Sequence, residues 1–381
     1  MLILGIETSC DDTCISLLKI ENCELKIISN VVSSQVKLHA KYGGVYPFLA
    51  KREHQRNLMP VFIEVLSKAG LLKIRNQKLK TKNINQNSKL EEFFIKYEKP
   101  KINLSGVTIG PGLEPCLWQG VNFAKKLVKE LKKPLIPVNH IEAHILVNFI
   151  NGNFQLPTAN FQKIFPAICL VVSGGHTQLI LMKRIGKYKL IGETRDDAAG
   201  ECFDKIARIL GLGYPGGPKI AIEAAKPLVP SNLKFSIKLP RPMIFQKNYD
   251  FSFSGLKTAV LYDFKNRPKK IRKSKIYIHQ MTKEAQQAII DVLIYKTIKA
   301  AKDFRVKSII LGGGVGANEE LRKQFKLKIE SYKWKINFLV PPKDLCTDNA
   351  IMTAITAFFH QEEKIDFSKV SEIKADSNLR I

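Results

Sequence analysis

The sequence predicts an α/β protein built from two similar halves, and two repeated patterns carry this prediction. Residues 2–20 (LILGIETSCDDTCISLLKI) and residues 167–183 (AICLVVSGGHTQLILMK) each read as a strand, a tight polar turn and a second strand. Downstream of each hairpin, a strand ends in a glycine loop that opens a helix, from residue 105 and again from residue 308. In such a duplicated chain we expect the ligand in a cleft between the two lobes, where turn amides and helix N-termini suit an anion.

The length of 381 residues, 45% of them hydrophobic, is enough for two domains with cores of their own. We expect a first lobe over 1–150 and a second over 151–345, with a C-terminal helix at about 346–381 packing back on the first lobe. The boundary falls in the polar, turn-rich stretch near 146–165. Residues 75–100 are rich in Asn and Lys, lack apolar periodicity and close with a proline, so we expect a mobile surface insertion there.

Composition also constrains the surroundings of the protein. The chain has no run of eighteen apolar residues, and residues 2–6 already read as a buried strand, so we expect a soluble, cytoplasmic protein without a membrane partner. The odd number of cysteines and the absence of any C-x-x-C pair argue against a disulfide framework and against a cysteine zinc site. The seven cysteines stand at positions 10, 14, 23, 116, 169, 202 and 346.

The net charge of +27, from 61 Lys and Arg against 34 Asp and Glu, points to a polyanionic partner, with nucleic acid as the first candidate. Compositional drift in an AT-rich genome would also enrich Lys, Ile and Asn, so charge alone leaves both readings open. The excess thickens over 68–101 and over 265–275. A basic run such as 265–275 is more often a solvated loop than a recognition element.

The segment His140-Ile141-Glu142-Ala143-His144 is the sharpest local signal. On a helix, residues four apart lie on one face, so the two imidazoles can converge on one metal ion. In a zinc peptidase motif the glutamate directly follows the first histidine. Here Glu142 stands two residues on, about 200° around the helix from His140, which disfavours peptidase chemistry. Two structural histidines on one helix face remain the alternative.

A second chemical signal lies at 196–218 (DDAAGECFDKIARILGLGYPGGP). Its spacing predicts a helix with one apolar face, and Asp204 lies on the opposite, charged face. A solvated acid is the ordinary interpretation of Asp204. The helix nevertheless follows a hairpin of the phosphate-binding type and ends at a glycine-rich turn, and an acid in that place could hydrogen-bond ribose hydroxyls.

Ten short motifs follow one another in order, almost from end to end of the chain. They are GIETSCDDT at 5, VKLHAKYGGVYPFLAKREH at 36, GPGL at 110, HIEAH at 140, VSGGHTQL at 172, DDAAGECFDK at 196, YPGGP at 214, DFSFSGLKT at 250, GGGVGAN at 312 and CTDNAIM at 346. Together these motifs resemble the bacterial-type tRNA threonylcarbamoyladenosine transferases, formerly described as sialoglycoprotein endopeptidases. The resemblance implies the duplicated actin-like ATPase fold, as in sugar kinases and heat-shock ATPases, with ribonuclease H-like halves.

The resemblance implies one divalent metal ion per subunit, Fe²⁺ or Zn²⁺, on His140, His144 and Asp348. Two imidazoles and one carboxylate leave open positions, as a catalytic ion requires. It implies acidic residues near the reaction centre at Asp11 and Asp12, although relatives often have Glu at the second position. Ala143 and Gly316 also depart from the usual residues without removing a ligand. The implied contacts to the nucleotide are Val171, Val172, Ser173, Gly174 and Gly175 around the phosphate and acyl part, Asp204 and Gly217 by the ribose, and Asn318 by the adenosine.

The implied reaction transfers a threonylcarbamoyl group from threonylcarbamoyl-AMP to the N6 amine of adenosine 37, beside the anticodon, in tRNAs that read codons beginning with A. The resemblance also implies a paralogue-like dimer partner (TsaB-like) and a small ATPase (TsaE-like). Two other classes stay open: an actin-fold kinase of a small molecule, and a non-enzymatic RNA-binding ATPase module. A kinase would need no histidine pair with a distant aspartate, and a binding module would survive the loss of His140.

Overall fold

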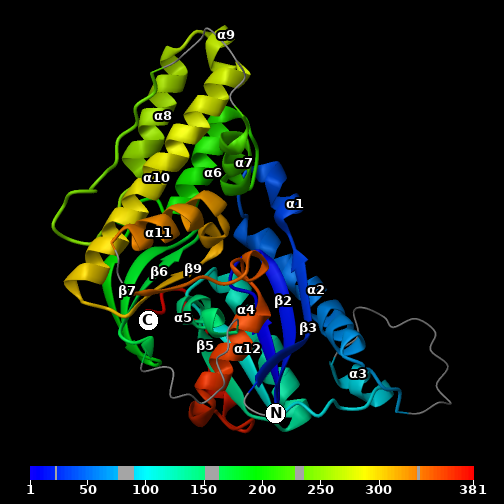
Figure 1. Cartoon of the computed structure of the whole chain (residues 1–381). Coiled ribbons are helices and arrows are strands. Elements are labelled where there is room, and N and C mark those ends of the chain that lie inside the picture. Colours follow the sequence, from blue (N-terminus) through cyan, green and yellow to red (C-terminus); the bar gives the residue numbers. More distant parts are fainter. Residues whose placement is uncertain (22–23, 76–89, 151–162, 228–235, 333–334) are drawn as a thin grey trace. The chain divides into compact units, whose positions relative to one another are not determined.

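The computed structural model describes residues 1–21, 24–75, 90–150, 163–227, 236–332 and 335–381 (Figure 1). The chain divides into two compact units. Unit 1 comprises Met1–His39, Val45–Ala159 and Asp348–Ile381, and unit 2 comprises Ala40–Gly44 and Asn160–Thr347. Most of the linker expected near 146–165 lies outside the described residues.

Unit 1 is built on a five-stranded sheet in the order β3-β2-β1-β4-β5. The first three strands form antiparallel pairs, while β1 pairs with β4, and β4 with β5, in parallel. The strands are β1 Leu2–Glu7, β2 Asp12–Glu21, β3 Glu24–Ser34, β4 Leu104–Gly110 and β5 Leu135–Asn139. The polar turn of the first hairpin therefore stands at the end of β1, in the middle of the sheet.

Unit 2 repeats this topology, with its sheet in the order β10-β9-β6-β7-β8. Again an antiparallel meander, β6-β7-β8, is extended by two parallel strands on the side of its first strand. The strands are β6 Ala167–Val172, β7 Thr177–Arg184, β8 Lys187–Glu193, β9 Ser308–Gly312 and β10 Asn337–Leu339. The matching strand orders confirm the duplicated α/β fold that the repeated sequence patterns predict.

Helices cover both faces of the unit 1 sheet. Helices α2 (Pro47–Lys68) and α4 (Glu114–Leu131) enclose one hydrophobic core, and α12 (Ala350–Phe359) packs on β1 and β4. A Cβ on Gly5 would lie 2.0 Å from the Ala350 carbonyl oxygen, so the absence of a side chain lets α12 approach the sheet. The helix expected over about 346–381 is shorter than predicted: it spans Ala350–Phe359, and the chain beyond it packs on unit 1 without forming an α-helix, with Ile365 bridged to Leu135 of β5. The short helices are α1 Val36–His39 and α5 His140–Leu146, with 3₁₀ turns at Val147–Phe149, Gln361–Glu363 and Val370–Glu372. The 3₁₀ turn at Ala40–Tyr42 belongs to unit 2.

The expectation of a surface insertion over 75–100 is wrong at its C-terminal end. Residues 76–89 lie outside the described residues, but α3 (Leu90–Lys96) is a buried part of the unit 1 core. Phe93 and Phe94 meet Phe62 of α2 edge to face, with ring centroids 5.9 and 6.5 Å apart. Two adjacent aromatic residues do not form a periodic pattern that predicts a helix from the sequence. Their packing against Phe62 is what places α3 in the core.

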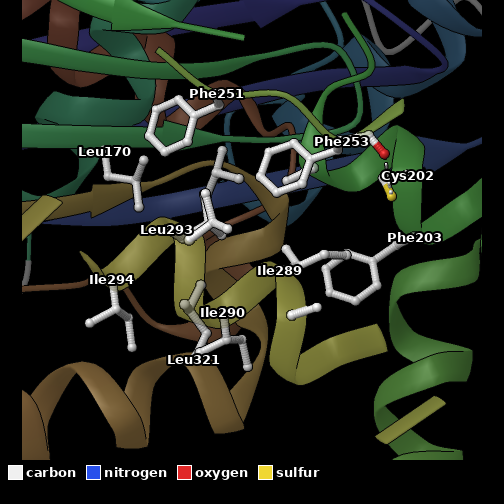
Figure 2. Close-up of a cluster of buried hydrophobic side chains, with 14 of the residues drawn as sticks. Leu170, Cys202, Phe203, Phe251, Phe253, Ile289, Ile290, Leu293, Ile294 and Leu321 are labelled. Atoms are coloured by element: carbon white, nitrogen blue, oxygen red, sulfur yellow. Dashed lines mark hydrogen bonds between the residues drawn. The ribbon is translucent and has the colours of Figure 1, made fainter. Parts of the chain in front are cut away.

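Unit 2 has a long central helix, α10 (Lys275–Asp303), which packs with α6 (Ala199–Leu210), α7 (Gly216–Ala225) and α8 (Ser254–Asn266). Figure 2 shows part of the core, in which Phe203 of α6 and Phe251 and Phe253 of the segment before α8 meet Ile289 and Leu293 of α10. The remaining helices are α9 Lys269–Arg272 and α11 Glu319–Ser331, with 3₁₀ turns at Gly314–Ala317 and Lys343–Leu345. The apolar face predicted for the helix after residue 196 is buried as expected.

The basic run and the cysteines can be compared with what the sequence predicts. The basic run 265–275 is not a loop: it spans the end of α8, the whole of α9 and the first residue of α10. The six described cysteines are free thiols. Within the described ranges, no helix combines the length and the apolar character needed to cross a membrane.

Candidate functional site

The histidine motif forms α5, a buried helix that starts directly at the end of β5. Asn139 caps it, with its side-chain oxygen accepting from the amides of Ile141 (2.9 Å) and Glu142 (3.2 Å). His140 and His144 stand one turn apart with ring centroids 4.6 Å apart, and both side chains are buried. The helical spacing expected from the sequence is therefore present, and it places both imidazoles on one face of α5.

Asp348 lies against both imidazoles. Its Oδ1 is 3.7 Å from His140 Nε2 and 3.3 Å from His144 Nε2, and the potential ligand atoms of the three residues lie within 4.8 Å of one another. Neither ring nitrogen of the buried His144 has a hydrogen-bond partner among the described residues. A buried imidazole whose ring nitrogens make no hydrogen bond is costly even with the Asp348 carboxylate 3.3 Å away, and a cation at this point would satisfy it. The donor set thus fits a mononuclear metal site with two nitrogens and one carboxylate.

Glu7, at the end of β1, orients the first histidine. The carboxylate is fully buried and accepts from the Ser9 amide and the Thr108 hydroxyl, both at 2.5 Å, while His140 Nδ1 lies 3.2 Å from Oε2. Burial disfavours the charged form, but the contact with His140 holds the pKa of Glu7 below its usual value, and it raises the pKa of His140 to about 9. With Nδ1 held by a carboxylate, Nε2 faces Asp348. A carboxylate on the ring nitrogen that does not bind the metal fixes histidine ligands in this way in metal proteins.

Glu142 points away from this cluster, as its place on the helix predicts. Its carboxylate lies 2.9 Å from Nε2 of His360, the residue that follows α12. His360 Nδ1 lies 2.9 Å from Glu363. Glu142 therefore links α5 to the end of α12 and cannot serve as the general base of a peptidase.

The acidic turn between β1 and β2 carries Asp11 and Asp12. Both carboxylates are largely withdrawn from water, and one oxygen of each lacks a hydrogen-bond partner within the described part of the chain. Burial, aided by the charge of Asp348, raises the pKa of Asp11, and it raises the pKa of Asp12 to about 7. A carboxyl that titrates near neutrality can exchange protons during a reaction.

Gln35 and His54, just before and at the end of the long motif that begins at Val36, hydrogen-bond to the backbone of this turn. His54 of α2 is buried, with Nε2 3.0 Å from the Cys10 carbonyl oxygen and Nδ1 2.8 Å from the Thr13 hydroxyl. The carbonyl can only accept, so Nε2 carries the proton and Nδ1 accepts from Thr13. The amide of Gln35 donates to the Asp11 carbonyl at 3.1 Å. Two side-by-side carbonyls of the acidic turn are thus held by buried partners.

The residues expected around the nucleotide lie in unit 2. Val171 and Val172 are buried in β6, and the turn that follows is closed by the Ser173 amide donating to the His176 carbonyl at 2.8 Å. The Gly200 amide at the start of α6 donates to the Ser173 carbonyl at 3.1 Å. A backbone hydrogen bond therefore joins the second hairpin turn to the N-terminus of α6.

Two further nucleotide candidates hold helix ends. Asp204 of α6 accepts from the amide of Gly216 at 2.6 Å, next to Gly217 at the start of α7. Asn318 caps α11 through the amide of Leu321 (3.0 Å) and donates to Gln286 of α10 at 2.9 Å. The 3₁₀ turn before Asn318 packs on β6 and α6, so these residues surround the end of β6.

The glycines around β6 are of two kinds. At Gly313, φ is +86° and a Cβ would lie 2.4 Å from the Val172 carbonyl oxygen, so only glycine fits there. A Cβ on Gly216 would collide with Asp204 and Phe203 backbone atoms at 2.6 Å. By contrast, a Cβ on Gly174, Gly175 or Gly217 would meet no described atom within 4 Å. The first kind lets backbone segments pack, and the second leaves bare backbone toward open space, as a phosphate cradle requires.

Sequence reasoning missed the supporting residues. Glu7 could have been found, because it is the sole charged residue in the apolar strand LILGIE and such a residue indicates a buried carboxylate with a specific partner. His54 and Thr108 gave no signal, because their partners are 41 and 101 residues away in the chain.

The fold and these sites define the class: a duplicated actin-like α/β protein with a candidate metal site in one unit and glycine-lined turns in the other. A solved structure of full-length HypF shares this fold, with a TM-score of 0.50 and 12% identity over 95% of this chain and 56% of HypF.

The family follows from sequence comparison. The sequence model described as tRNA N6-adenosine threonylcarbamoyltransferase matches residues 26–76 and 91–355. A relative from Thermosipho africanus with that name is 42% identical over 381 residues, covering 100% of both chains. One from Persephonella marina is 42% identical over 374 residues, covering 97% of this chain and 93% of the relative. The chain therefore belongs to the tRNA N6-adenosine threonylcarbamoyltransferase family and is a transferase.

Proposed function

We propose that the chain transfers the threonylcarbamoyl group of threonylcarbamoyl-AMP to N6 of adenosine 37 in tRNAs that read codons beginning with A. The observation that carries the proposal is the assembly of His140, His144 and Asp348 into one buried site, in a chain whose relatives bear this activity in their names. The net charge of +27 supports a polyanionic substrate.

His140, His144 and Asp348 would hold one divalent ion per subunit, and Fe²⁺ and Zn²⁺ both suit this ligand set. When bound, the ion supplies a Lewis acid that polarises a carbonyl oxygen and orients the group to be transferred. Glu7 accepts a hydrogen bond from His140 Nδ1 and so keeps the lone pair of Nε2 available toward the site, and burial excludes water from the imidazoles.

In unit 2 we assign the adenylate part of the donor to the residues around the end of β6. The bare backbone at Gly174 and Gly175, after Val171, Val172 and Ser173, suits the phosphate. We assign the ribose hydroxyls to Asp204 and Gly217 and the adenosine to Asn318. The open space over Gly217 and the fixed orientation of the Asp204 and Asn318 side chains support these roles.

The reaction is a displacement at the carbonyl carbon of a mixed anhydride. The N6 amine of adenosine forms the new C–N bond, the bond from that carbon to the phosphate oxygen of AMP breaks, and AMP leaves with the electron pair. The amine then loses one proton. Asp11 and Asp12 lie in a turn whose backbone is fixed by His54 and Gln35, and a carboxyl of Asp12 with a pKa of about 7 is suited to accept that proton. Because adenine N6 is a weak nucleophile, positioning contributes more than base strength.

Two protein partners are part of the proposal. The family resemblance implies a paralogue-like dimer partner and a small ATPase, so the assay includes an arm in which both are supplied.

The test is transfer of radiolabelled threonine from threonylcarbamoyl-AMP into unmodified tRNA, with and without the partner proteins. We expect incorporation by the wild type and its loss in His140→Ala. Glu142→Gln is the matched control, because it alters a buried residue of the same helix that faces His360. Transfer by His140→Ala at the wild-type level would show that the metal site has no part in the mechanism. ATP hydrolysis or phosphorylation of a small molecule, without any label transfer in the complete mixture, would favour the kinase class instead.

A further inference from the structure

The basic run left unexplained by the sequence forms an ordered tip on unit 2. Helix α8 ends at Asn266, the four-residue α9 follows, and α10 starts at Lys275, so α9 joins two longer helices at their far end (Figure 1). Ser274 caps α10 through the amide of Tyr277 at 3.3 Å, and the amide of Arg272 bonds the Pro268 carbonyl at 3.0 Å. The backbone that carries the charges is therefore fixed.

The two arginines of the run are used within the tip. Arg267 binds both carboxylate oxygens of Asp263, at 3.0 and 2.9 Å, and the Tyr277 hydroxyl donates to the same acid at 2.7 Å. The guanidinium of Arg272 lies 5.2 Å from the centre of the Phe264 ring. These contacts neutralise the nearest acid and brace α8 against α10.

Five lysines remain and point to solvent. They have no acidic side-chain partner in the part of the chain that the structure describes, and we call them the basic tip: Lys265, Lys269, Lys270, Lys273 and Lys275. Between Asp263 and Glu284 the chain has no acidic residue, and Glu284 is itself paired with Arg241. Glu223 of the neighbouring α7 is paired with Lys226. Among the described residues, the nearby acids are paired with other cations, so the positive field of the tip is uncompensated.

We propose that the basic tip is a docking surface for the phosphate backbone of the RNA substrate. Lysine ammonium groups act as flexible point charges that suit phosphates and carry no base sequence information. The proposal rests on the proposed function for the identity of the RNA, and it adds where on unit 2 that RNA is held.

The position of the tip agrees with this role. Lys275 and Gln286 are eleven residues apart on α10, about 16 Å along the helix axis at 1.5 Å per residue. Gln286 is the partner of Asn318 in the candidate nucleotide site. A tRNA is several times longer than this distance, so one molecule can touch both regions.

The test compares two triple variants with the same loss of charge. Lys269/Lys270/Lys273→Ala removes the centre of the basic tip. Lys183/Lys187/Lys189→Ala removes three lysines that are also exposed, on the β7–β8 hairpin of the same unit. The dissociation constant for unmodified tRNA is measured by filter binding between 50 and 200 mM salt, and circular dichroism checks the fold of both proteins.

We expect the tip variant to bind tRNA about 10–100-fold more weakly, with the slope of log K against log salt reduced by about 2–3, since each lost phosphate contact removes close to one. The hairpin variant changes affinity by less than about threefold. Arginine at the three tip positions restores binding. In the transfer assay, the tip variant raises KM for tRNA and leaves kcat unchanged.

Equal weakening of both variants would overturn the proposal in favour of diffuse charge attraction. Unchanged tRNA affinity in the tip variant would also overturn it, and loss of binding to anionic phospholipid vesicles in that variant would then assign the tip to a membrane surface. Binding is measured without turnover, so tip-dependent tRNA binding by a protein that transfers no threonylcarbamoyl group separates failure of the proposed function from failure of this one.

Discussion

Replacing Glu7 by Gln tests whether the buried carboxylate prepares His140 for a metal ion. Glu7 uses its two oxygens for different donors: Oε1 takes the Ser9 amide, while Oε2 takes Thr108 and faces His140 Nδ1. A glutamine offers one oxygen and one NH₂ group. If the oxygen stays on the Ser9 amide, the NH₂ group donates toward Thr108 and His140 Nδ1, which reverses the hydrogen bond that places the proton on Nδ1. The substitution also removes the negative charge that favours a proton on Nδ1.

A carboxylate that hydrogen-bonds a histidine ligand contributes about 10–100-fold to metal affinity, which corresponds to about 1.4–2.8 kcal/mol. We therefore expect Glu7→Gln to bind Zn²⁺ that much more weakly, measured by competition between the metal-free protein and a chromophoric chelator. Glu142→Gln is the matched control. It makes the same change of charge in a buried side chain of α5, but on the face that meets His360, so its affinity should stay within about twofold of wild type.

The reasoning fails if Glu7→Gln binds Zn²⁺ as tightly as the wild type while His140→Ala does not bind it. It fails equally if Glu142→Gln weakens binding as much as Glu7→Gln, because the effect would then reflect general disturbance of α5. Thermal melts of the metal-free proteins show whether either variant has lost its fold.

Three further predictions concern the framework of unit 1. The hydrogen bond to Glu142 raises the pKa of His360 from 6.5 to about 9, so the pair stabilises the fold fully below pH 6.5 and less as pH rises through 9. His360→Gln should therefore lose about 1–2 kcal/mol at pH 6 and almost nothing above pH 10 in urea titrations, allowing for the exposure of Glu363. Phe93→Ala should cost about 3–5 kcal/mol, because α3 belongs to the core; a cost below about 1 kcal/mol would return this helix to the surface. His54→Ala leaves a buried carbonyl and hydroxyl unpaired, so we expect a loss of about 2–4 kcal/mol in unfolding free energy and a fall in kcat that exceeds any change in KM, and a proportional change in both would contradict the positioning role.

Local patterns in the sequence were sufficient for the two hairpins, the strand-loop-helix units after them and their repetition. Alternating apolar residues around a polar turn define a hairpin within about twenty residues, and the spacing of His140 and His144 places both on one face of a helix without any knowledge of the fold. The same helical geometry turned Glu142 away from the histidines, and the structure confirms it. Asp348 and the nucleotide-site candidates other than Asp204 came from resemblance to a family rather than from spacing.

Tertiary structure alone decided which distant residues meet. Asp348 reaches His144 across 204 positions, Glu7 reaches His140 across 133, and His54 reaches Cys10 across 44, all because strands and helices remote in the chain pack side by side. The same cause moved α3 from an expected surface insertion into the core, since Phe93 and Phe94 are ordered by Phe62 of another helix. The sequence gives the chemical type of each residue and the local periodicity of its pattern. The burial that shifts a carboxyl's pKa, and the partner that orients an imidazole, exist only once the sheet has formed.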